Sequence, residues 1–287
     1  MPTNQRDDST IGLIPASAFS YQELTDAYNH TRVDYLVPMP MNANKLREYV
    51  ENYDIDMDAS AVAIDGQEIL GLAMLGVREH RAWITRLGII QRRRRRGAGQ
   101  TLVTHLIEQA CERNVDYIII EVIDNNVPAH NLFVKNGFTH TRQLLVLRRP
   151  PISPKIEVPP ADIKILGYSE AVKLLERRSS KPSWLDEKES LLHAGKLEAF
   201  YATLPNGSEG WLVYQNTIFQ LSRLVIQTEK GDPLQVGRAL LHRLHTEHSA
   251  QDTKTENLPK DDPHWPAFKE MGYLVEFVRN EMILHLK

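Results

Sequence analysis

Residues 91–100, QRRRRRGAGQ, combine the two residue types that hold an anionic group, arginine and glycine. Arginine offers paired N–H donors that match phosphate oxygens, and glycine lets the backbone come close to a ligand. A helix N-terminus adds unpaired N–H groups and a partial positive charge. The segment therefore predicts a phosphate or pyrophosphate site, provided that a helix begins within it. Arg94 and Arg96 are the better candidates, whereas Arg92 and Arg93 are expected to be solvated.

The surrounding pattern supplies that helix and the strands beside it. Residues 98–113 carry apolar side chains at helical spacing, and apolar segments at 83–90 and 116–123 are typical of strands. A further helix is predicted to begin at Pro128 and to end before Gly137. The preceding residues predict a short strand, two helices and a hairpin that turns at Asp65-Gly66. Strands and helices in this mixed order predict an α/β or α+β layer fold.

Three known phosphate-binding patterns can be compared with this segment. The P-loop pattern GxxxxGK[ST] is absent, and the dinucleotide pattern GxGxxG is broken by Leu102. The pattern Arg/Gln-x-x-Gly-x-Gly/Ala is met at residues 94–99, and residues 126–138 match Asn-x-x-Ala-x-x-Leu-Tyr-x-x-x-Gly-Phe, with Phe133 in place of the tyrosine. Together with the strands RLGII and IIIEVIDNN, these motifs resemble the GNAT superfamily of acetyl-CoA-dependent N-acetyltransferases. The resemblance covers about residues 10–148.

The resemblance implies a V-shaped opening between the strands 83–90 and 116–123 that takes the pantetheine arm of acetyl-CoA. It implies that backbone groups of one strand pair with this arm, that the arginine-glycine segment holds the pyrophosphate, and that the last helix lines the other side. The residues assigned to acetyl-CoA in this way are Gly88, Ile89, Ile90, Arg94, Arg95, Arg96, Gly97, Ala98, Gly99, Gln100, Asn126, Asn131 and Phe133.

Acetyl transfer to an amine needs a group that removes a proton from the amine. Glu121 is the first candidate because burial within an apolar strand raises the pKa of a carboxyl group, but it equally suits a structural role. His80 and His130 are further candidates. Members of the resembled family often use a tyrosine to protonate the leaving thiolate, and Phe133 has no proton to give.

The acceptor of the acetyl group is not identified by any motif. In the resembled family the acceptor pocket is built from the first helices and their loops, here about residues 28–55. Tyr35 and Trp83 are candidates for its lining, although ordinary strand packing explains Trp83 equally well. We expect a small-molecule amine or a peptide amine to be the partner.

A proline-rich stretch near the middle divides the chain. Residues 150–163 read as a linker, because prolines lack the N–H that helices and ladders need. The predicted domains are residues 1–149, which bind acetyl-CoA, and residues 164–287, which repeat the plan: SRLVIQ resembles TRLGII and PAFKEMGYL resembles HNLFVKNGFTH. The second domain lacks the arginine run, and its Asp232 suits a helix N-cap. It is therefore predicted not to bind CoA.

Composition and charge limit which other classes of protein the sequence fits. The chain has 287 residues, formal net charge -3 and one cysteine. Residues 1–150 carry 17 basic and 18 acidic side chains and residues 151–287 carry 17 and 19, so neither half is a polycation. The absence of a leader-like start or a long apolar run favours a cytoplasmic protein without a membrane segment, and no metal-ligand spacing is present. We expect a monomer or a homodimer that does not bind nucleic acid.

Two other functions compete with the N-acetyltransferase. A non-catalytic acyl-CoA-binding or sensing protein is favoured by Phe133 and by the absence of a base on strand 83–90. A nucleic-acid-binding module would use the run Arg92–Arg96, although the balanced charge is unfavourable to it.

Overall fold

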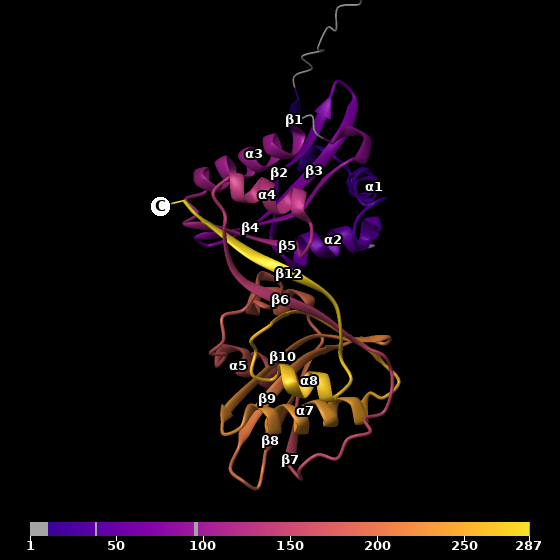
Figure 1. The fold of residues 1–287 in the computed structure, drawn as a ribbon, viewed down its shortest axis with the longest axis vertical. Coiled ribbons are helices and arrows are strands. Elements are labelled where there is room, and N and C mark those ends of the chain that lie inside the picture. Colours follow the sequence, from indigo (N-terminus) through magenta and orange to yellow (C-terminus); the bar gives the residue numbers. More distant parts are fainter. Residues whose placement is uncertain (1–10, 38, 95–96, 287) are drawn as a thin grey trace, which may run out of the picture. The chain divides into compact units, whose positions relative to one another are not determined.

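The computed structural model describes residues 11–37, 39–94 and 97–286, and Figure 1 shows its helices and strands. The chain divides into two compact units. Unit 1 comprises residues 1–141 together with 281–287, and unit 2 comprises residues 142–280.

Unit 1 contains a sheet with helices on both faces. Its strands follow the order β1-β2-β3-β4-β5-β12-β6, in which β4 and β5 pair in parallel and the pairs β1–β2, β2–β3 and β3–β4 are antiparallel. The mixed, mostly antiparallel sheet flanked by helices confirms the predicted fold class. The elements are β1 (Gly12–Pro15), a 3-10 turn (Ala16–Ala18), α1 (Tyr21–Thr31), α2 (Ala43–Asn52), β2 (Ile55–Asp65), β3 (Glu68–Arg78), β4 (Arg81–Ile89), a 3-10 turn (Gln91–Arg93), α3 (Ala98–Glu112), β5 (Tyr117–Ile123), α4 (Val127–Lys135), β6 (Thr139–Arg149) and β12 (Leu274–His285).

The two faces of the unit 1 sheet have different partners. Helices α3 and α4 cover one face, where Leu102 and Leu106 pack with Ile118 and Ile120 in the main apolar core (Figure 1). Helices α1 and α2 cover the other face, where Tyr49 of α2 lies against the ring of Trp83 with 6.1 Å between ring centroids. Alternation along the strands sends neighbouring side chains to opposite faces, so this division decides which side chains meet which helix.

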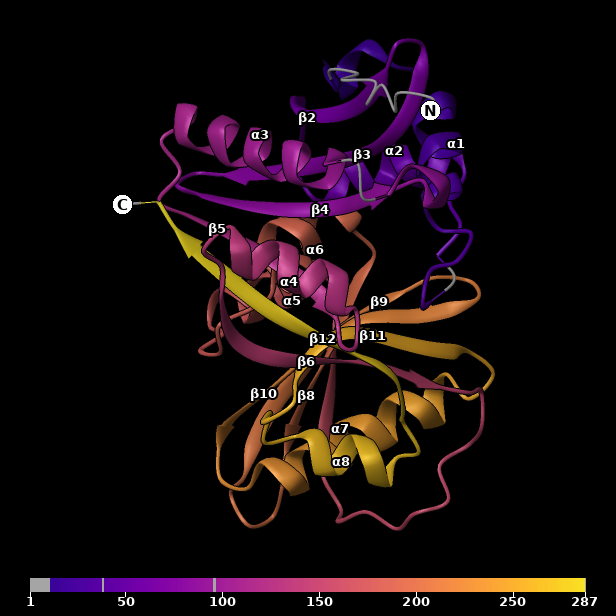
Figure 2. The same cartoon turned by 45° about the horizontal axis from the view of Figure 1, so that its top comes forward.

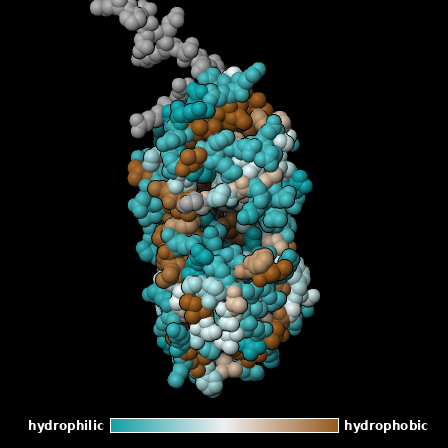
Figure 3. Space-filling view, turned by 90° about the vertical axis from the view of Figure 1, so that its right-hand side faces the viewer, coloured by the Kyte–Doolittle hydropathy of each residue, from teal (hydrophilic) through white to brown (hydrophobic). Residues whose placement is uncertain are grey.

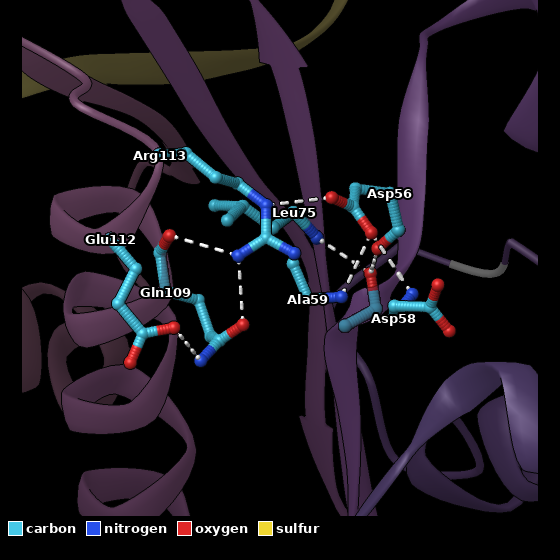
Figure 4. A network of polar contacts seen from close by, with 8 residues as sticks. Asp56, Asp58, Ala59, Leu75, Gln109, Glu112 and Arg113 are labelled. Atoms are coloured by element: carbon cyan, nitrogen blue, oxygen red, sulfur yellow. Dashed lines mark hydrogen bonds and ion pairs between the residues drawn. The ribbon is translucent and has the colours of Figure 1, made fainter.

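A network of polar contacts fastens the C-terminal end of α3 to β2 (Figure 4). Arg113 donates from Nε to Asp56 Oδ2 over 2.7 Å and from Nη1 to Gln109 Oε1 over 2.8 Å. The other oxygen of Asp56 accepts the backbone N–H groups of Asp58 and Ala59, at 3.0 and 2.9 Å. These contacts hold the C-terminal end of α3 against β2, and its N-terminus lies near the end of β4 (Figure 2).

Unit 2 has the same kind of sheet. Its strands follow the order β7-β8-β9-β10-β11-β6-β12, with β10 and β11 parallel. Its apolar core gathers Phe200, Leu240 and Phe268, all fully buried. The elements are β7 (Asp162–Leu166), α5 (Tyr168–Glu176), a 3-10 turn (Trp184–Asp186), α6 (Lys188–Ala194), β8 (Leu197–Thr203), β9 (Glu209–Asn216), β10 (Gln220–Lys230), α7 (Pro233–Glu247), β11 (Asp252–Pro259) and α8 (Trp265–Glu270).

Strands β6 and β12 each belong to both units. The division falls after residue 141 in β6 and after residue 280 in β12, whereas the sequence predicts a division at the proline-rich segment. In unit 1, Met282 is 1% exposed within the core, and the N–H of Leu286 donates to the carbonyl of Asp116 over 2.9 Å. The end of the chain therefore completes the sheet of unit 1.

Candidate functional site

The sheet of unit 1 opens between β4 and β5. Parallel pairing runs from Arg81 and Tyr117 to Ile84 and Ile120, and then stops. Just beyond this point Arg86 has φ of +54°, and the register between β3 and β4 shifts. A bulge of this kind bends a strand and is common beside functional sites. The second half of β4 stays with β3 and leaves β5, which creates the predicted opening.

The bulge decides which backbone groups of β4 face this opening. The N–H of Ile90 donates to the carbonyl of Leu70 over 2.8 Å, on the β3 side. Because backbone groups alternate along a strand, Gly88 also faces β3, and Leu87 and Ile89 face the opening. Of the three residues predicted to meet the pantetheine arm, only Ile89 directs its backbone groups toward the opening. Leu87, which was not among the predicted residues, does so as well.

The N-terminus of α3 lies next to the end of β4. Gly97 precedes the helix with φ of +90°, a left-handed conformation that favours glycine, and the first helical bond runs from Thr101 N to its carbonyl over 3.0 Å. Among the described residues, the N–H groups of Ala98, Gly99 and Gln100 have no acceptor, and the first turn holds no acidic side chain. The helix end is thus suited to an anion.

Gly99 and Gln100, in the first turn of α3, have neighbours that limit how a ligand can contact them. A Cβ added at Gly99 would lie 3.5 Å from Leu132 and 3.7 Å from Ile89, so the helix start is packed closely on one side. The side-chain amide of Gln100 donates to Asn136 Oδ1 over 2.6 Å, which ties α3 to the end of α4. Only the backbone of Gln100 is therefore left for a ligand.

The arginine run divides into arginines with different partners. Arg92 and Arg93 both bind the carboxylate of Glu68, and this pairing raises the pKa of the Arg93 guanidinium. Arg94 binds Asp34 with two nitrogens, at 2.6 and 2.7 Å. Arg95 and Arg96, both predicted to meet the pyrophosphate, lie outside the described residues. In this structure Arg94 is thus held by a carboxylate of its own chain.

The far side of the opening is formed by the start of α4. Asn126 caps this helix by accepting the N–H of Ala129 over 3.3 Å, and its amide donates to Tyr35 Oη over 3.5 Å. Asn131 is exposed. Phe133 is only 5% exposed and packs edge-on against Phe138, with 5.3 Å between ring centroids. Phe133 is thus part of the apolar core of unit 1.

Glu121 is the first residue of β5 beyond the paired segment. Because Ile120 faces the α3 core, Glu121 belongs to the opposite face, which α1 and α2 cover. It is half-buried. His80 lies in the exposed turn before β4, at the end away from the opening, and His130 lies on α4. Of the candidate bases, Glu121 is the one that the sheet places at the vertex of the opening.

Several residues at this vertex were not singled out by the sequence analysis. The Arg86 guanidinium lies 4.0 Å from the centre of the Tyr49 ring and donates to Tyr28 Oη over 2.9 Å. Tyr49 Oη and Thr85 Oγ1 are 2.6 Å apart. Burial raises the pKa of Tyr49 further above its ordinary value, so this hydroxyl stays protonated. The sequence signal that could have identified Arg86 is the likeness between residues 85–87, TRL, and residues 222–224, SRL, which have an arginine at the same position.

The corresponding part of unit 2 has the same bulge, but the residues around it differ from those of unit 1. Pairing of β10 with β11 stops at Ser222 and Lys254, and Arg223 has φ of +53°, nearly that of Arg86. At the start of α7, Asp232 Oδ1 accepts the N–H of Leu234 over 3.0 Å, so the predicted N-cap is present. The helix start that is uncapped in unit 1 is thus occupied by a carboxylate in unit 2.

A histidine also links the two sides of the unit 2 opening. His264, 4% exposed, donates from Nδ1 to Asp262 Oδ1, and a second hydrogen bond joins its Nε2 to the Thr228 hydroxyl, both over 2.9 Å. Asp262 and His264 follow β11, whereas Thr228 is on β10. Nearby, Asn257 of β11 donates to the hydroxyl of Ser183 over 3.1 Å. In unit 2, side-chain hydrogen bonds therefore join the strand β10 to the segment after β11, beside a cavity that both of them line.

The described part of the chain has neither a metal-binding cluster nor a helix that could cross a membrane. Residues 11–37, 39–94 and 97–286 contain no group of three or more His, Cys, Asp or Glu side chains that could hold a metal ion. Within the same residues, no helix combines the length and the apolar character needed to cross a membrane.

Comparisons with known proteins agree with this fold. Residues 22–138 match the Acetyltransferase (GNAT) family. A tandem GNAT protein from the clavulanic acid biosynthesis pathway superposes on 96% of this chain and 98% of its own, with TM-score 0.65 and 11% identity. A GCN5-related N-acetyltransferase from Sphaerobacter thermophilus covers 96% of each chain, with TM-score 0.64 and 16% identity. These likenesses extend over both units and concern the fold. No curated protein sequence matches the chain.

Proposed function

We propose that the protein, whose residues 22–138 match the Acetyltransferase (GNAT) family, transfers an acetyl group from acetyl-CoA to a primary amine by direct attack on the thioester. One observation carries this proposal: the opening between β4 and β5 leads to a helix N-terminus whose first N–H groups have no acceptor among the described residues. An extended polar arm that ends in a pyrophosphate fits this combination.

The unit 1 residues divide the binding of acetyl-CoA between them. The N–H groups of Ala98, Gly99 and Gln100 receive the pyrophosphate, and Arg94 supplies positive charge beside them. The backbone of Leu87 and Ile89 faces the pantetheine arm. The helix start is in place before the ligand arrives, which lowers the entropic cost of binding.

Glu121 removes a proton from the acceptor amine in the proposed reaction. Its place beyond Ile120 puts it on the α1–α2 face, where an acceptor would approach, whereas CoA is held toward α3. The amine nitrogen then attacks the thioester carbonyl, and the N–H groups of Leu87 and Ile89 are donors for the developing oxyanion. The thiolate leaves without a proton from Phe133, which has none to give.

The acceptor is a small-molecule amine or a peptide amine in this proposal. The α1–α2 side of the molecule faces the viewer in Figure 3, and apolar groups there are interspersed among polar ones. The loop between α1 and α2 contributes Val33 and Leu36, which are 77% and 58% exposed. A mixed surface of this kind accommodates an amine that carries some apolar surface.

The proposed function is tested by two measurements on the full-length protein. Calorimetric titration with CoA reports binding, and a thiol-release assay with acetyl-CoA and a panel of amines reports turnover. We expect CoA binding together with thiol release for at least one amine. CoA binding without thiol release would favour the alternative, a non-catalytic acyl-CoA-binding protein, which the burial of Phe133 supports. The second alternative, nucleic-acid binding, is disfavoured because the charge of the chain is balanced and Glu68 pairs with both Arg92 and Arg93.

We further propose that unit 2 does not bind CoA. Asp232 caps α7, and its charge repels a phosphate at that position. Thr228, Asp262 and His264 line a cavity beside the start of α7 and hydrogen-bond to one another, so fewer of their polar groups are left for a ligand.

Titration of the full-length chain is expected to give a stoichiometry of about one CoA per chain, since of the two corresponding helices α3 and α7 only α3 begins without a capping carboxylate. The intact chain is required because unit 1 includes residues 281–287, which a fragment ending near residue 155 lacks. A stoichiometry of two would contradict the proposal. Substitution of Gly99 tells which unit holds the bound molecule.

A further inference from the structure

Residues 32–35, which we term the strap, contact the elements that border the opening of unit 1. Arg32 Nη2 donates to the carbonyl of Leu87 over 3.1 Å, and the Tyr35 hydroxyl accepts from the amide of Asn126 over 3.5 Å. Leu87 is on β4, and Asn126 follows β5. A short segment after α1 is thus attached to both sides of the opening.

Asp34 makes the third and closest attachment of the strap. Its two oxygens accept two parallel bonds from Arg94, at 2.7 and 2.6 Å, and Arg94 Nε donates to the carbonyl of Ile89 over 3.2 Å. Paired bonds of this kind are the geometry in which arginine also recognises phosphate. The bond from Arg94 lowers the pKa of Asp34, so its carboxylate is charged at neutral pH.

Arg32 and Arg94 also occupy the two β4 carbonyls that face the opening, those of Leu87 and Ile89. These are the acceptors that an amide-bearing arm would use on this strand. The Arg32 guanidinium lies over the Tyr35 ring at 4.0 Å, which holds the strap together, while its buried Nε has no partner among the described residues. The strap and Arg94 together therefore pair with both carbonyls, but the strap leaves one of its own buried donors, Arg32 Nε, without an acceptor among the described residues.

We propose that Asp34 is an internal competitor of acetyl-CoA, and that the strap closes the opening until a phosphate replaces the Asp34 carboxylate at Arg94. This inference rests on the proposed function, because it takes acetyl-CoA as the ligand. Binding then exchanges one charge-assisted pair at Arg94 for another. The affinity for CoA is lowered by the stability of the Asp34–Arg94 pair.

Asp34→Asn removes the charge of the competitor and keeps its shape. We expect CoA to bind about three- to tenfold more tightly, because partly exposed ion pairs are weak and bidentate ones only somewhat stronger. The side chains of Arg94 and Asp34 are 41% and 30% exposed, which places the pair in this range. The measurement is calorimetric titration of the folded full-length variants with CoA.

Two comparisons separate competition from general effects. Asp26→Asn makes the same change in net charge on exposed α1, where Asp26 binds Gln22 over 2.9 Å, and should leave the affinity near wild type. In an Arg94→Ala background, Asp34→Asn should give no gain beyond that control, because the two residues then no longer interact. If wild type binds CoA and Asp34→Asn binds it no better, Asp34 is not a competitor. If neither the wild type nor any variant binds CoA, the proposed function itself is wrong, and with it the ligand that this inference assumes.

Discussion

Gly99→Glu is expected to abolish CoA binding while leaving the protein folded. The new carboxylate would stand in the first turn of α3, beside the N–H groups of Ala98 and Gln100 that are proposed to receive the pyrophosphate. Two like charges about 4 Å apart repel by about 4 kcal/mol near a protein surface, so a loss of at least ~100-fold is expected. The fold should tolerate the change, because an acidic side chain stabilises a helix N-terminus. Calorimetric titration with CoA measures the loss.

Two variants at the same position distinguish charge from volume. Gly99→Gln has nearly the size of Gly99→Glu without its charge, and Gly99→Ala adds a Cβ that meets Leu132 and Ile89 at ordinary contact distances. We expect the affinity for CoA to fall in the order Ala, Gln, Glu, with Ala near wild type. Unchanged affinity in a folded Gly99→Glu protein would mean that the pyrophosphate does not lie at α3.

Glu121→Gln is expected to lower kcat by about 100-fold or more at neutral pH, the usual contribution of a positioned base. The affinity for CoA should stay near wild type, because Glu121 lies on the α1–α2 face of β5 and the proposed CoA contacts lie on β4 and α3. The measurements are kcat for the best amine in the panel and a CoA titration. The pH profile adds a second readout: the rise of kcat with pH in wild type should be lost in the variant.

Asp124→Asn is the matched control for this variant, because it makes the same charge change one residue after β5 ends at Ile123. It should retain most of the activity. A Glu121→Gln protein with normal kcat and a lower melting temperature would show that Glu121 only stabilises the strand. In that case a water chain or another group deprotonates the amine.

Local signals explain why the elements around the site were predictable. The strand predicted at 83–90 is observed as β4 (Arg81–Ile89), and the helix predicted at 98–113 is α3 (Ala98–Glu112). Hydrophobic periodicity and glycine or proline at the ends suffice for such elements, because neighbouring residues carry the signal. The same holds for the N-cap at Asp232, which depends on residues two positions apart.

The partners of the arginines could not be predicted in the same way. Asp34 and Arg94 are 60 positions apart in the sequence, and no periodicity relates them. Likewise, nothing near Ile90 tells that its N–H faces β3, since the register follows from the bulge at Arg86. Side-chain pairing across a fold depends on its three-dimensional course, which a single sequence does not state.

The division of β12 between the two units has a consequence for biosynthesis. Unit 1 consists mainly of the first 141 residues, yet its core includes Met282. In addition, Thr141 Oγ1 donates to the carbonyl of Glu281 over 3.1 Å. The sheet that borders the proposed CoA site therefore cannot be completed on the ribosome until about 280 residues have been made. Such contacts between distant parts of the chain slow folding. A nascent or C-terminally shortened chain would thus have its main defect in the unit that was synthesised first.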